Sequence, residues 1–231
     1  KRSLGKKEME QLSKNACCGC GACVQICPKQ CIRLEEDEEG FPYPCADGEK
    51  CIHCGLCETI CPAVNRRRNE FKVEVYAAAA RERGILMRSS SGGMAGILAE
   101  YALDKSGVVF GAAFNDKMEL IHSAAETEEE CVKFHGSKYV QSRTENTYMQ
   151  RKQYLEEGRY VLYTGTPCQI AGLKQYLQRD YENLLAVELI CHGVPSPGIW
   201  RKYVKELEKE KGEEIVDASF RYQDEGWKIF R

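Results

Sequence analysis

Residues 17–28 read CCGCGACVQICP, and residues 51–62 read CIHCGLCETICP. Each stretch places its cysteines with two, two and three residues between them, and each ends in Cys-Pro. The spacing selects eight cysteines, which are Cys17, Cys20, Cys23 and Cys27 in the first run and Cys51, Cys54, Cys57 and Cys61 in the second. The repeat predicts two copies of one cysteine-rich loop that lie against each other.

Cysteines at this spacing are typical of bacterial ferredoxins, in which the fourth cysteine of each run ligates the other cluster. Three thiolates within one short loop can bind one cluster, and two antiparallel copies can exchange the fourth ligand. Zinc is disfavoured, because zinc sites usually use two CxxC pairs per ion. We therefore expect two [4Fe-4S] clusters: cluster one on Cys17, Cys20, Cys23 and Cys61, and cluster two on Cys51, Cys54, Cys57 and Cys27.

The distribution of the cysteines along the chain argues against a disulfide scaffold. Eleven of the 14 cysteines lie between Cys17 and Cys61, whereas a disulfide scaffold would be stapled along its whole length. Cys18 could exchange with Cys17 as a ligand, but a bystander role is the simpler expectation. Cys31 is expected to be a buried small apolar residue, and Cys45 is expected to pack in a loop.

Composition limits the partners and the compartment. The chain has 231 residues and a formal net charge of -2, so no strong field favours nucleic acid or a membrane surface. It has no apolar run of membrane-spanning length and no visible signal peptide. It begins at Lys1 rather than Met, which leaves open a natural N-terminus further upstream. Clustered cysteines without an export signal indicate metal ligands in a reducing cytoplasm.

The sequence pattern changes near residue 70. Residues 1–66 are expected to form a ferredoxin-type domain, the polar stretch 65–70 a linker, and residues 71–231 a second domain. In the second domain we expect strands at 72–80, 108–114, 119–125, 160–163, 184–190 and 214–222, and helices at 92–104, 128–134, 145–157, 169–178 and 197–211. The fold class is therefore α+β: a small double-cluster domain followed by an α/β domain with a mixed, partly parallel sheet.

Four polar patches in the second domain could carry chemistry. Residues 88–93 (RSSSGG) precede an expected helix with Ser91 as its N-cap, and such a helix start can bind a phosphate; a simple helix cap is the alternative. Residues 135–142 (HGSKYVQS) are rich in hydrogen-bonding groups, with a surface loop as the alternative. Residues 164–169 (TGTPCQ) and 189–196 (LICHGVPS) each follow an expected strand and contain one cysteine.

The last two patches contain Cys168 and Cys191, which could act together. If the strands before them are parallel neighbours, both cysteines emerge at the carboxyl edge of the sheet, where open α/β sheets bind ligands. A thiol at a helix N-terminus has a lowered pKa, which favours Cys168 as a metal ligand or nucleophile. The two cysteines could share a metal cluster; the alternative is two unrelated loop cysteines.

Together these patches resemble the coenzyme F420 hydrogenase/dehydrogenase beta-subunit family. The matching stretches are SSGG at 90–93, GSKYVQS at 136–142, GTPCQ at 165–169 and CHGVPS at 191–196. The resemblance implies an FAD-containing iron–sulfur oxidoreductase. It implies a flavin pocket formed by Ser90, Ser91, Gly92, Gly93, Ser137 and Lys138, and a third [4Fe-4S] cluster with Cys168 and Cys191 as two of its ligands.

The resemblance also bears on the extent of the chain. In that family the other two ligands of the third cluster come from a CxxC further downstream, and this sequence ends at Arg231 without one. We therefore expect the N-terminal part of a longer protein, with its second domain truncated. The third cluster would need ligands beyond residue 231, and the flavin pocket could be incomplete.

The expected function is electron transfer between the [4Fe-4S] clusters and an FAD that reduces or oxidises an organic cofactor or substrate, with coenzyme F420 as one candidate. The alternative is a flavin-free electron-transfer subunit that docks to a partner redox enzyme. Expected partners are a ferredoxin or a hydrogenase/dehydrogenase subunit, and an organic electron donor or acceptor. No acid–base pair stands out in the sequence, so the catalytic residues are unassigned; His135, Lys138 and His192 are candidates.

Overall fold

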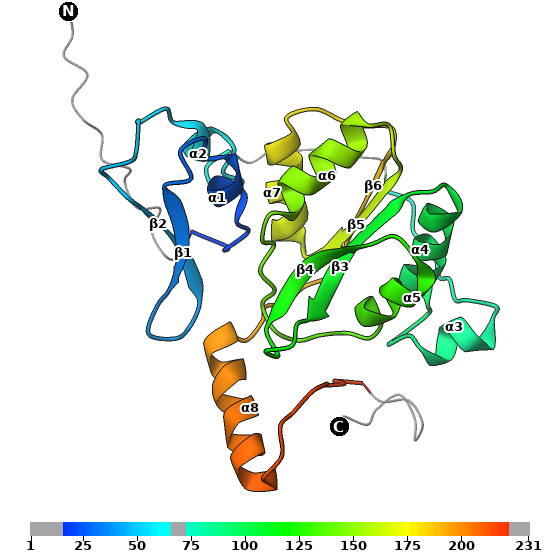
Figure 1. Cartoon of the computed structure of the whole chain (residues 1–231). Coiled ribbons are helices and arrows are strands. Elements are labelled where there is room, and N and C mark those ends of the chain that lie inside the picture. The colour runs from blue at the N-terminus through cyan, green and yellow to red at the C-terminus, as the bar shows by residue number, and fades with distance from the viewer. Residues whose placement is uncertain (1–15, 66–72, 222–231) are drawn as a thin grey trace, which may run out of the picture.

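The computed structural model describes residues 16–65, termed the cysteine module, and residues 73–221, termed the sheet domain. Their strands form a β1–β2 hairpin and a four-stranded sheet in the order β4-β3-β5-β6 (Figure 1). The strands are β1 (Ile32–Glu36), β2 (Pro42–Ala46), β3 (Val108–Phe114), β4 (Leu120–Ala125), β5 (Val161–Gly165) and β6 (Leu184–Glu188). The helices are α1 (Ala22–Ile26), α2 (Leu56–Thr59), α3 (Arg83–Met87), α4 (Met94–Asp104), α5 (Glu128–Cys131), the 3-10 helix η1 (Val132–Phe134), α6 (Thr147–Glu156), α7 (Pro167–Leu177) and α8 (Pro197–Lys211).

The four-stranded sheet is mixed. β3 pairs antiparallel with β4 and parallel with β5, and β5 pairs parallel with β6. The segment from β5 through α7 to β6 is a βαβ unit, as the alternation after Tyr160 predicts. The expected fold class, a cysteine-rich module followed by an α/β domain with a mixed, partly parallel sheet, is confirmed.

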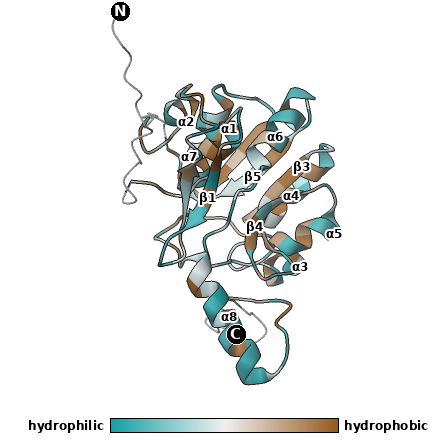
Figure 2. Cartoon of the chain, turned by 60° about the vertical axis from the view of Figure 1, so that its left-hand side comes forward, coloured by the Kyte–Doolittle hydropathy of each residue, from teal (hydrophilic) through white to brown (hydrophobic). Residues whose placement is uncertain are grey.

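Alternate side chains along the strands divide the core into two layers. Phe110 and Tyr163 face α6, α7 and the cysteine module, in a cluster that includes Cys20. Val109 and Leu162 face α4 and α5 on the opposite side. Because helices cover both faces, these strands are apolar on both faces, and β3 is coloured hydrophobic in Figure 2.

The two cysteine runs adopt the same local structure. Each has a glycine in the left-handed conformation directly before a short helix: Gly21 (φ 75°) before α1 and Gly55 (φ 73°) before α2. L side chains rarely adopt this conformation, so glycine lets each run turn sharply between its second and third cysteines. The two helices also pack against each other. The repeat in the sequence is therefore a repeat in the structure.

The cysteine module contacts the sheet domain through its first run. The backbone oxygen of Cys20 accepts hydrogen bonds from Thr144 Oγ1 and Tyr148 Oη, each at 3.0 Å. Gln25 Oε1 accepts a hydrogen bond from Tyr148 N at 2.8 Å. Gly172 of α7 leaves room for this contact, since a Cβ there would lie 2.8 Å from Cys20 Sγ. The first cysteine loop is therefore held directly against α6 and α7.

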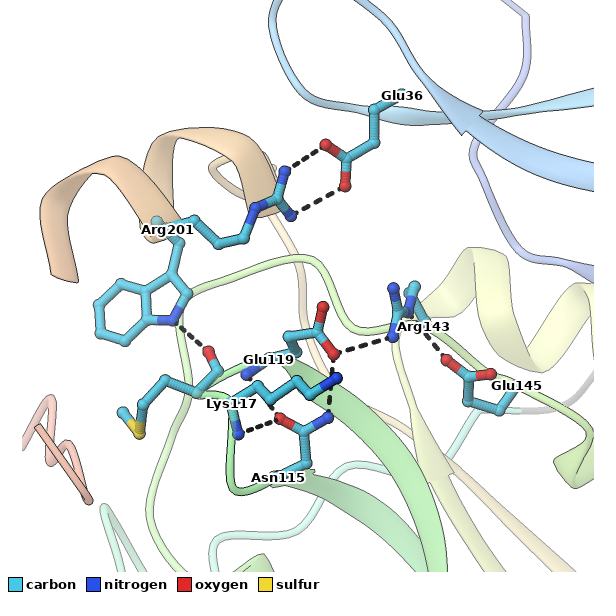
Figure 3. Close-up of polar contacts among 9 residues, drawn as sticks. Glu36, Asn115, Lys117, Glu119, Arg143, Glu145 and Arg201 are labelled. Atoms are coloured by element: carbon cyan, nitrogen blue, oxygen red, sulfur yellow. Dashed lines mark hydrogen bonds and ion pairs between the residues drawn. The ribbon is translucent and has the colours of Figure 1, made fainter. Parts of the chain in front are cut away.

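The β1–β2 hairpin makes a second contact, with the start of α8 (Figure 3). Glu36 accepts hydrogen bonds from both terminal nitrogens of Arg201. Gly198 N donates to Gly40 O at 3.2 Å, and a Cβ on Gly198 would lie 2.6 Å from Gly40 Cα. Two contacts at separate places therefore fix the orientation of the cysteine module.

α8 is in turn anchored to the β3–β4 hairpin. The indole nitrogen of Trp200 donates a hydrogen bond to Met118 O at 2.7 Å. Nearby, Arg143 lies between two carboxylates, at 3.2 Å from Glu119 and 2.8 Å from Glu145 (Figure 3). These half-exposed ion pairs each contribute little to stability, so burial of Trp200 is the main anchor.

Two expected strands, 72–80 and 214–222, are wrong where the structure describes them. Residues 73–80 and 214–221 are irregular. Ala80 N donates to Gly92 O at 2.7 Å, so this segment lies along a loop rather than along a strand. The side chain of Phe220 packs against the apolar cluster that contains Trp200 and Val204 of α8. Apolar alternation predicted both strands, but neither segment pairs with a sheet edge.

The other expected elements are present, those at 108–114 and 197–211 with the expected ends and the rest with shifted ends. The helix expected over 92–104 begins at Met94, and its N-cap is Gly93 rather than Ser91, because the capping residue has a left-handed φ of 81°. The helix expected over 128–134 is divided into α5 and η1. Most of the expected linker, residues 66–70, lies outside the described residues. No helix in the described ranges is long and apolar enough to span a membrane.

Replacing Gly198 with alanine should loosen the contact between the hairpin and α8. The added methyl group would meet the backbone of Gly40 at 2.6 Å, so the free energy of unfolding should fall by about 1–3 kcal/mol. Thermal unfolding of the cluster-loaded protein measures this change. Gly84→Ala is the matched control, because nothing lies within 4 Å of its Cβ position and alanine favours a helix. An equal loss in both variants would contradict the account.

Candidate functional site

The expected ligands of cluster one are partly assembled. The thiols of Cys17, Cys23 and Cys61 lie within electrostatic reach of one another. Burial raises the pKa of Cys17, and burial together with Cys17 and Cys61 raises the pKa of Cys23 to about 12. Such thiols need a nearby cation to ionise, which bound iron supplies. Cys61 of the second run thus lies with the first run, as an exchanged ligand would.

Cys20, the remaining expected ligand of cluster one, packs against the sheet domain. Its side chain is 8% exposed, packs over Gly172 and lies beside Cys18. Among the described residues, no three His, Cys, Asp or Glu side chains lie close enough to hold a single metal ion. A [4Fe-4S] cluster holds its thiolates at its corners, so thiols spaced for a cluster do not form a single-ion site.

The expected ligands of cluster two lie in two pairs, and Cys57 of one pair also neighbours Cys23 of the first run. Cys27 Sγ lies 3.4 Å from Cys31 Sγ, and Cys31 also neighbours Cys51. Cys57 neighbours Cys54, which is exposed. Cys27 of the first run therefore lies with the second run. Cys31 is buried, as expected, but it lies between two expected ligands.

Cys168, the second residue of α7, reaches the cysteine module. Its Sγ lies 3.1 Å from Thr166 Oγ1 and within hydrogen-bonding reach of Cys18. The hydrogen bond with Cys18, followed by burial, raises the pKa of Cys168. The lowered pKa expected for Cys168 at a helix N-terminus is therefore wrong, because these two effects outweigh the hydrogen bonds with Thr166 and with Gln169 N, which lower the pKa.

Cys191 lies beyond the same sheet edge as Cys168, because β5 and β6 are parallel neighbours. It is exposed, and its Sγ accepts a hydrogen bond from Gly193 N at 3.5 Å. His192, next to it, is exposed as well. The expected placement at one edge is correct, but Cys168 contacts the cysteine module whereas Cys191 faces solvent.

The two polar patches expected around a flavin meet in the structure. Ser137 N donates a hydrogen bond to Ser90 Oγ at 2.6 Å, although the residues are 47 positions apart. Gly93, three positions after Ser90, is the N-cap of α4, so the free backbone N–H groups of the first turn of this helix begin close to the junction. Ser91 is exposed, and Gly92 lies against Ala78 O. The arrangement offers hydrogen-bond donors suited to a phosphate.

Positive charge gathers at the same junction. Lys138 Nζ donates to His135 O at 2.7 Å and to Gly136 O at 3.3 Å. Burial lowers the pKa of Lys138 to about 8. Burial also lowers the pKa of His135, and the nearby charges of Arg88 and Lys138 lower it further. An anion placed here would relieve both effects.

The sequence offers little signal for two residues near these sites. Cys18 is expected to be a bystander, yet it links Cys168 to the cysteine module. Arg151 is fully buried in α6, although its local sequence, QRKQY at 150–154, is that of an exposed helix. The local sequence does not reveal either role, because Cys18 contacts Cys168 and the cover over Arg151 includes Tyr163 of β5.

Comparison with known families agrees with this geometry. Residues 16–65 match the 4Fe-4S dicluster domain, so the cysteine module defines an iron–sulfur electron-transfer protein. Residues 75–147 match the N-terminal part, and residues 158–230 the C-terminal part, of the coenzyme F420 hydrogenase/dehydrogenase beta subunit. The chain belongs to the coenzyme F420 hydrogenase/dehydrogenase beta-subunit family.

One solved relative is a chain in the F420-reducing [NiFe] hydrogenase complex from Methanosarcina barkeri. It shares 22% sequence identity with this chain, at a TM-score of 0.46. The likeness covers 55% of this chain and 47% of that chain, which is about half of the relative's length. No curated protein matches the sequence.

Replacing one expected ligand in each run tests the cluster assignments. Cys20→Ser should remove or convert cluster one, and Cys54→Ser should do the same to cluster two, because a thiolate is a much better ligand for iron–sulfur clusters than an alcohol. Iron content and the EPR spectrum of the reduced protein measure the loss. Cys45→Ser is the control, since this thiol lies on β2 rather than in the expected loop and outside both runs. Full iron content and an unchanged spectrum in Cys20→Ser would contradict the assignment.

Proposed function

We propose that the chain is the electron-transferring part of an FAD-dependent iron–sulfur oxidoreductase. Residues 1–66 serve as its electron inlet, and residues 71–231 as part of its flavin-binding domain. The observation that carries the proposal is the contact of the first cysteine run with α6 and α7, beside Cys168. With Cys20 as one of its ligands, cluster one would lie against the domain that contains both polar patches.

Cluster two is the entry end for electrons in this proposal. Its ligand Cys54 is exposed, and the neighbouring Ile52 and Leu56 are 56% and 37% exposed. Cluster one lies on the inner side, because Cys20 packs on α7. A redox partner protein, such as a ferredoxin or a hydrogenase/dehydrogenase subunit, can therefore approach cluster two while cluster one passes electrons inward.

FAD fits the junction between the two polar patches. Ser90 and Ser137 would bind it together with the backbone N–H groups before α4, and Arg88 and Lys138 would face its phosphates. Bound FAD would supply the exchange between single electrons and hydride transfer. Ser91, Gly92 and Gly93 shape the start of the helix beside it.

A third [4Fe-4S] cluster would lie between cluster one and the flavin. Cys168 and Cys191 are two proposed ligands, and two further ligands would come from beyond residue 231. Cys168 is already in contact with Cys18 of the cysteine module, so electrons would cross a short gap there. Of the candidate proton donors, His135 lies beside Lys138, whereas His192 is exposed in the loop after β6.

The organic substrate in this proposal is a hydride donor or acceptor. Coenzyme F420 is one candidate, because the family description and the solved relative both name it. The chain spans about half of that relative. Its substrate, its partner subunits and a cytoplasmic location are therefore part of the proposal for the whole protein.

A flavin-free electron-transfer subunit is the second candidate function. One observation favours it: Lys138 already donates to the carbonyl groups of His135 and Gly136 within its own loop. Flavin content separates the two functions. Full-length protein, purified anaerobically and treated with acid, should release FAD in stoichiometric amount under the main proposal. Absence of stoichiometric FAD would leave the flavin-free function.

Lys138→Met should weaken FAD binding. The substitution removes a charged hydrogen bond to phosphate, worth about 1.5–3 kcal/mol, so the dissociation constant should rise by roughly 10- to 150-fold. Fluorescence titration with FAD measures it. Lys133→Met is the matched control, because this exposed lysine in the same segment donates to Ala124 O outside the junction. Equal affinity in the Lys138→Met variant and the unmodified protein would contradict the assignment.

FAD affinity should also depend on pH through Lys138. Burial lowers the pKa of Lys138 to about 8, so in the flavin-free chain its charge is lost as pH rises through about 8. A phosphate binds the charged form, so affinity should be steady below about pH 8 and fall above it. Titrations across this range should show the fall in the unmodified protein, and Lys138→Met should flatten it. The same pH dependence in both proteins would assign the fall to another group.

A further inference from the structure

Arg151 is a fully buried cation that has no carboxylate partner within the part of the chain that the structure describes. It lies in α6, on the sheet face that supports the cysteine module, and it is 0% exposed. Its Nη2 donates to Tyr148 O at 3.5 Å, but within residues 16–65 and 73–221 no hydrogen-bond partner reaches Nε or Nη1. None of the ion pairs formed in these ranges involves it.

Aromatic rings surround the guanidinium group instead. Its central carbon lies 5.0 Å from the ring centroid of Tyr163 and 5.6 Å from that of Tyr148. Rings attract a cation without neutralising its charge. Burial lowers the pKa of Arg151 to about 10, so the group is still charged at pH 7. A buried, unpaired charge is costly, which indicates that a negatively charged group lies nearby in the cluster-loaded protein.

The same two tyrosines connect Arg151 with the first cysteine run. Tyr148 Oη lies 3.0 Å from Cys20 O, and Cys20 packs in the same core cluster as both rings. Tyr148 and Tyr163 each interact electrostatically with both Arg151 and the Cys20 thiol. Arg151 therefore lies on the sheet-domain side of Cys20, behind one layer of rings and away from solvent that would screen its charge.

We propose that Arg151 supplies a fixed positive charge that raises the reduction potential of cluster one. This inference rests on the assignment of Cys20 as a ligand of that cluster. A reduced cluster carries one more negative charge than an oxidised one, so its attraction to Arg151 inside the protein is stronger. Arg151 thus stabilises the reduced form and draws electrons from cluster two towards the sheet domain.

An EPR-monitored redox titration of the cluster-loaded protein tests this proposal. Arg151→Met keeps an unbranched apolar chain and removes the charge. It should shift the reduction equilibrium of cluster one at least tenfold towards the oxidised form, which is a fall of 59 mV for one electron. In Arg151→Lys, which retains the positive charge, the reduction potential of cluster one should stay close to that of the unmodified protein. Cluster two is the internal reference, and its potential should not change.

Lys152→Met is the matched control for charge. Lys152 is the next residue of α6, but its side chain faces solvent, 4.0 Å from Glu156. Removing this screened charge should leave both potentials unchanged. An unchanged cluster-one potential in Arg151→Met would overturn the proposal, as would an equal fall in Arg151→Met and Lys152→Met.

Arg151→Gln provides a second neutral variant if Arg151→Met does not bind cluster one. Loss of cluster one from both neutral variants, with retention in Arg151→Lys, supports the proposal, because the anionic cluster then requires the cation. Loss from all three variants would show a packing role and overturn it. Absence of iron from the unmodified protein would instead overturn the cluster assignment, and FAD content does not enter these measurements.

Discussion

The hydroxyl group of Tyr148 holds the two parts of the chain together. It lies 3.0 Å from Cys20 O and 2.8 Å from Gln169 O, so one buried group joins the cysteine module to α6 and α7. A buried hydroxyl must find such partners, so its loss would remove a direct link between the two parts of the chain. The contact of the first cysteine run with α6 and α7 depends on this arrangement, as do the contact of Cys18 with Cys168 and the surroundings of Arg151.

Local rules in the sequence account for much of the fold. The spacing of the cysteines requires two equal loops, and Gly21 and Gly55 provide their turns. The helix over 197–211 has Ser196 and Gly212 at its ends, and the structure has it at the predicted residues. The strands expected at 72–80 and 214–222 failed because alternation describes one segment, whereas a strand also requires a partner.

The candidate site shows the same division between local and tertiary information. The family resemblance implied that Ser90 and Ser137 belong to one pocket, and the two residues are joined by a hydrogen bond. The contact of Cys18 with Cys168 joins segments far apart in the chain, and the burial of Arg151 depends on packing against Tyr163 of β5, so no local pattern reveals them. For Cys168, the helix start predicted a lowered pKa, but the neighbouring thiol reversed the sign.

An anaerobic reductive titration of the purified full-length protein tests the central claim most directly. Absorbance would follow the iron–sulfur clusters and the flavin while electrons are added in known amounts. The account predicts that both chromophores bleach and that the protein takes up the electrons of its clusters plus two for the flavin. Uptake that stops at the clusters, with no flavin bleaching, would contradict the claim that this chain passes electrons to FAD.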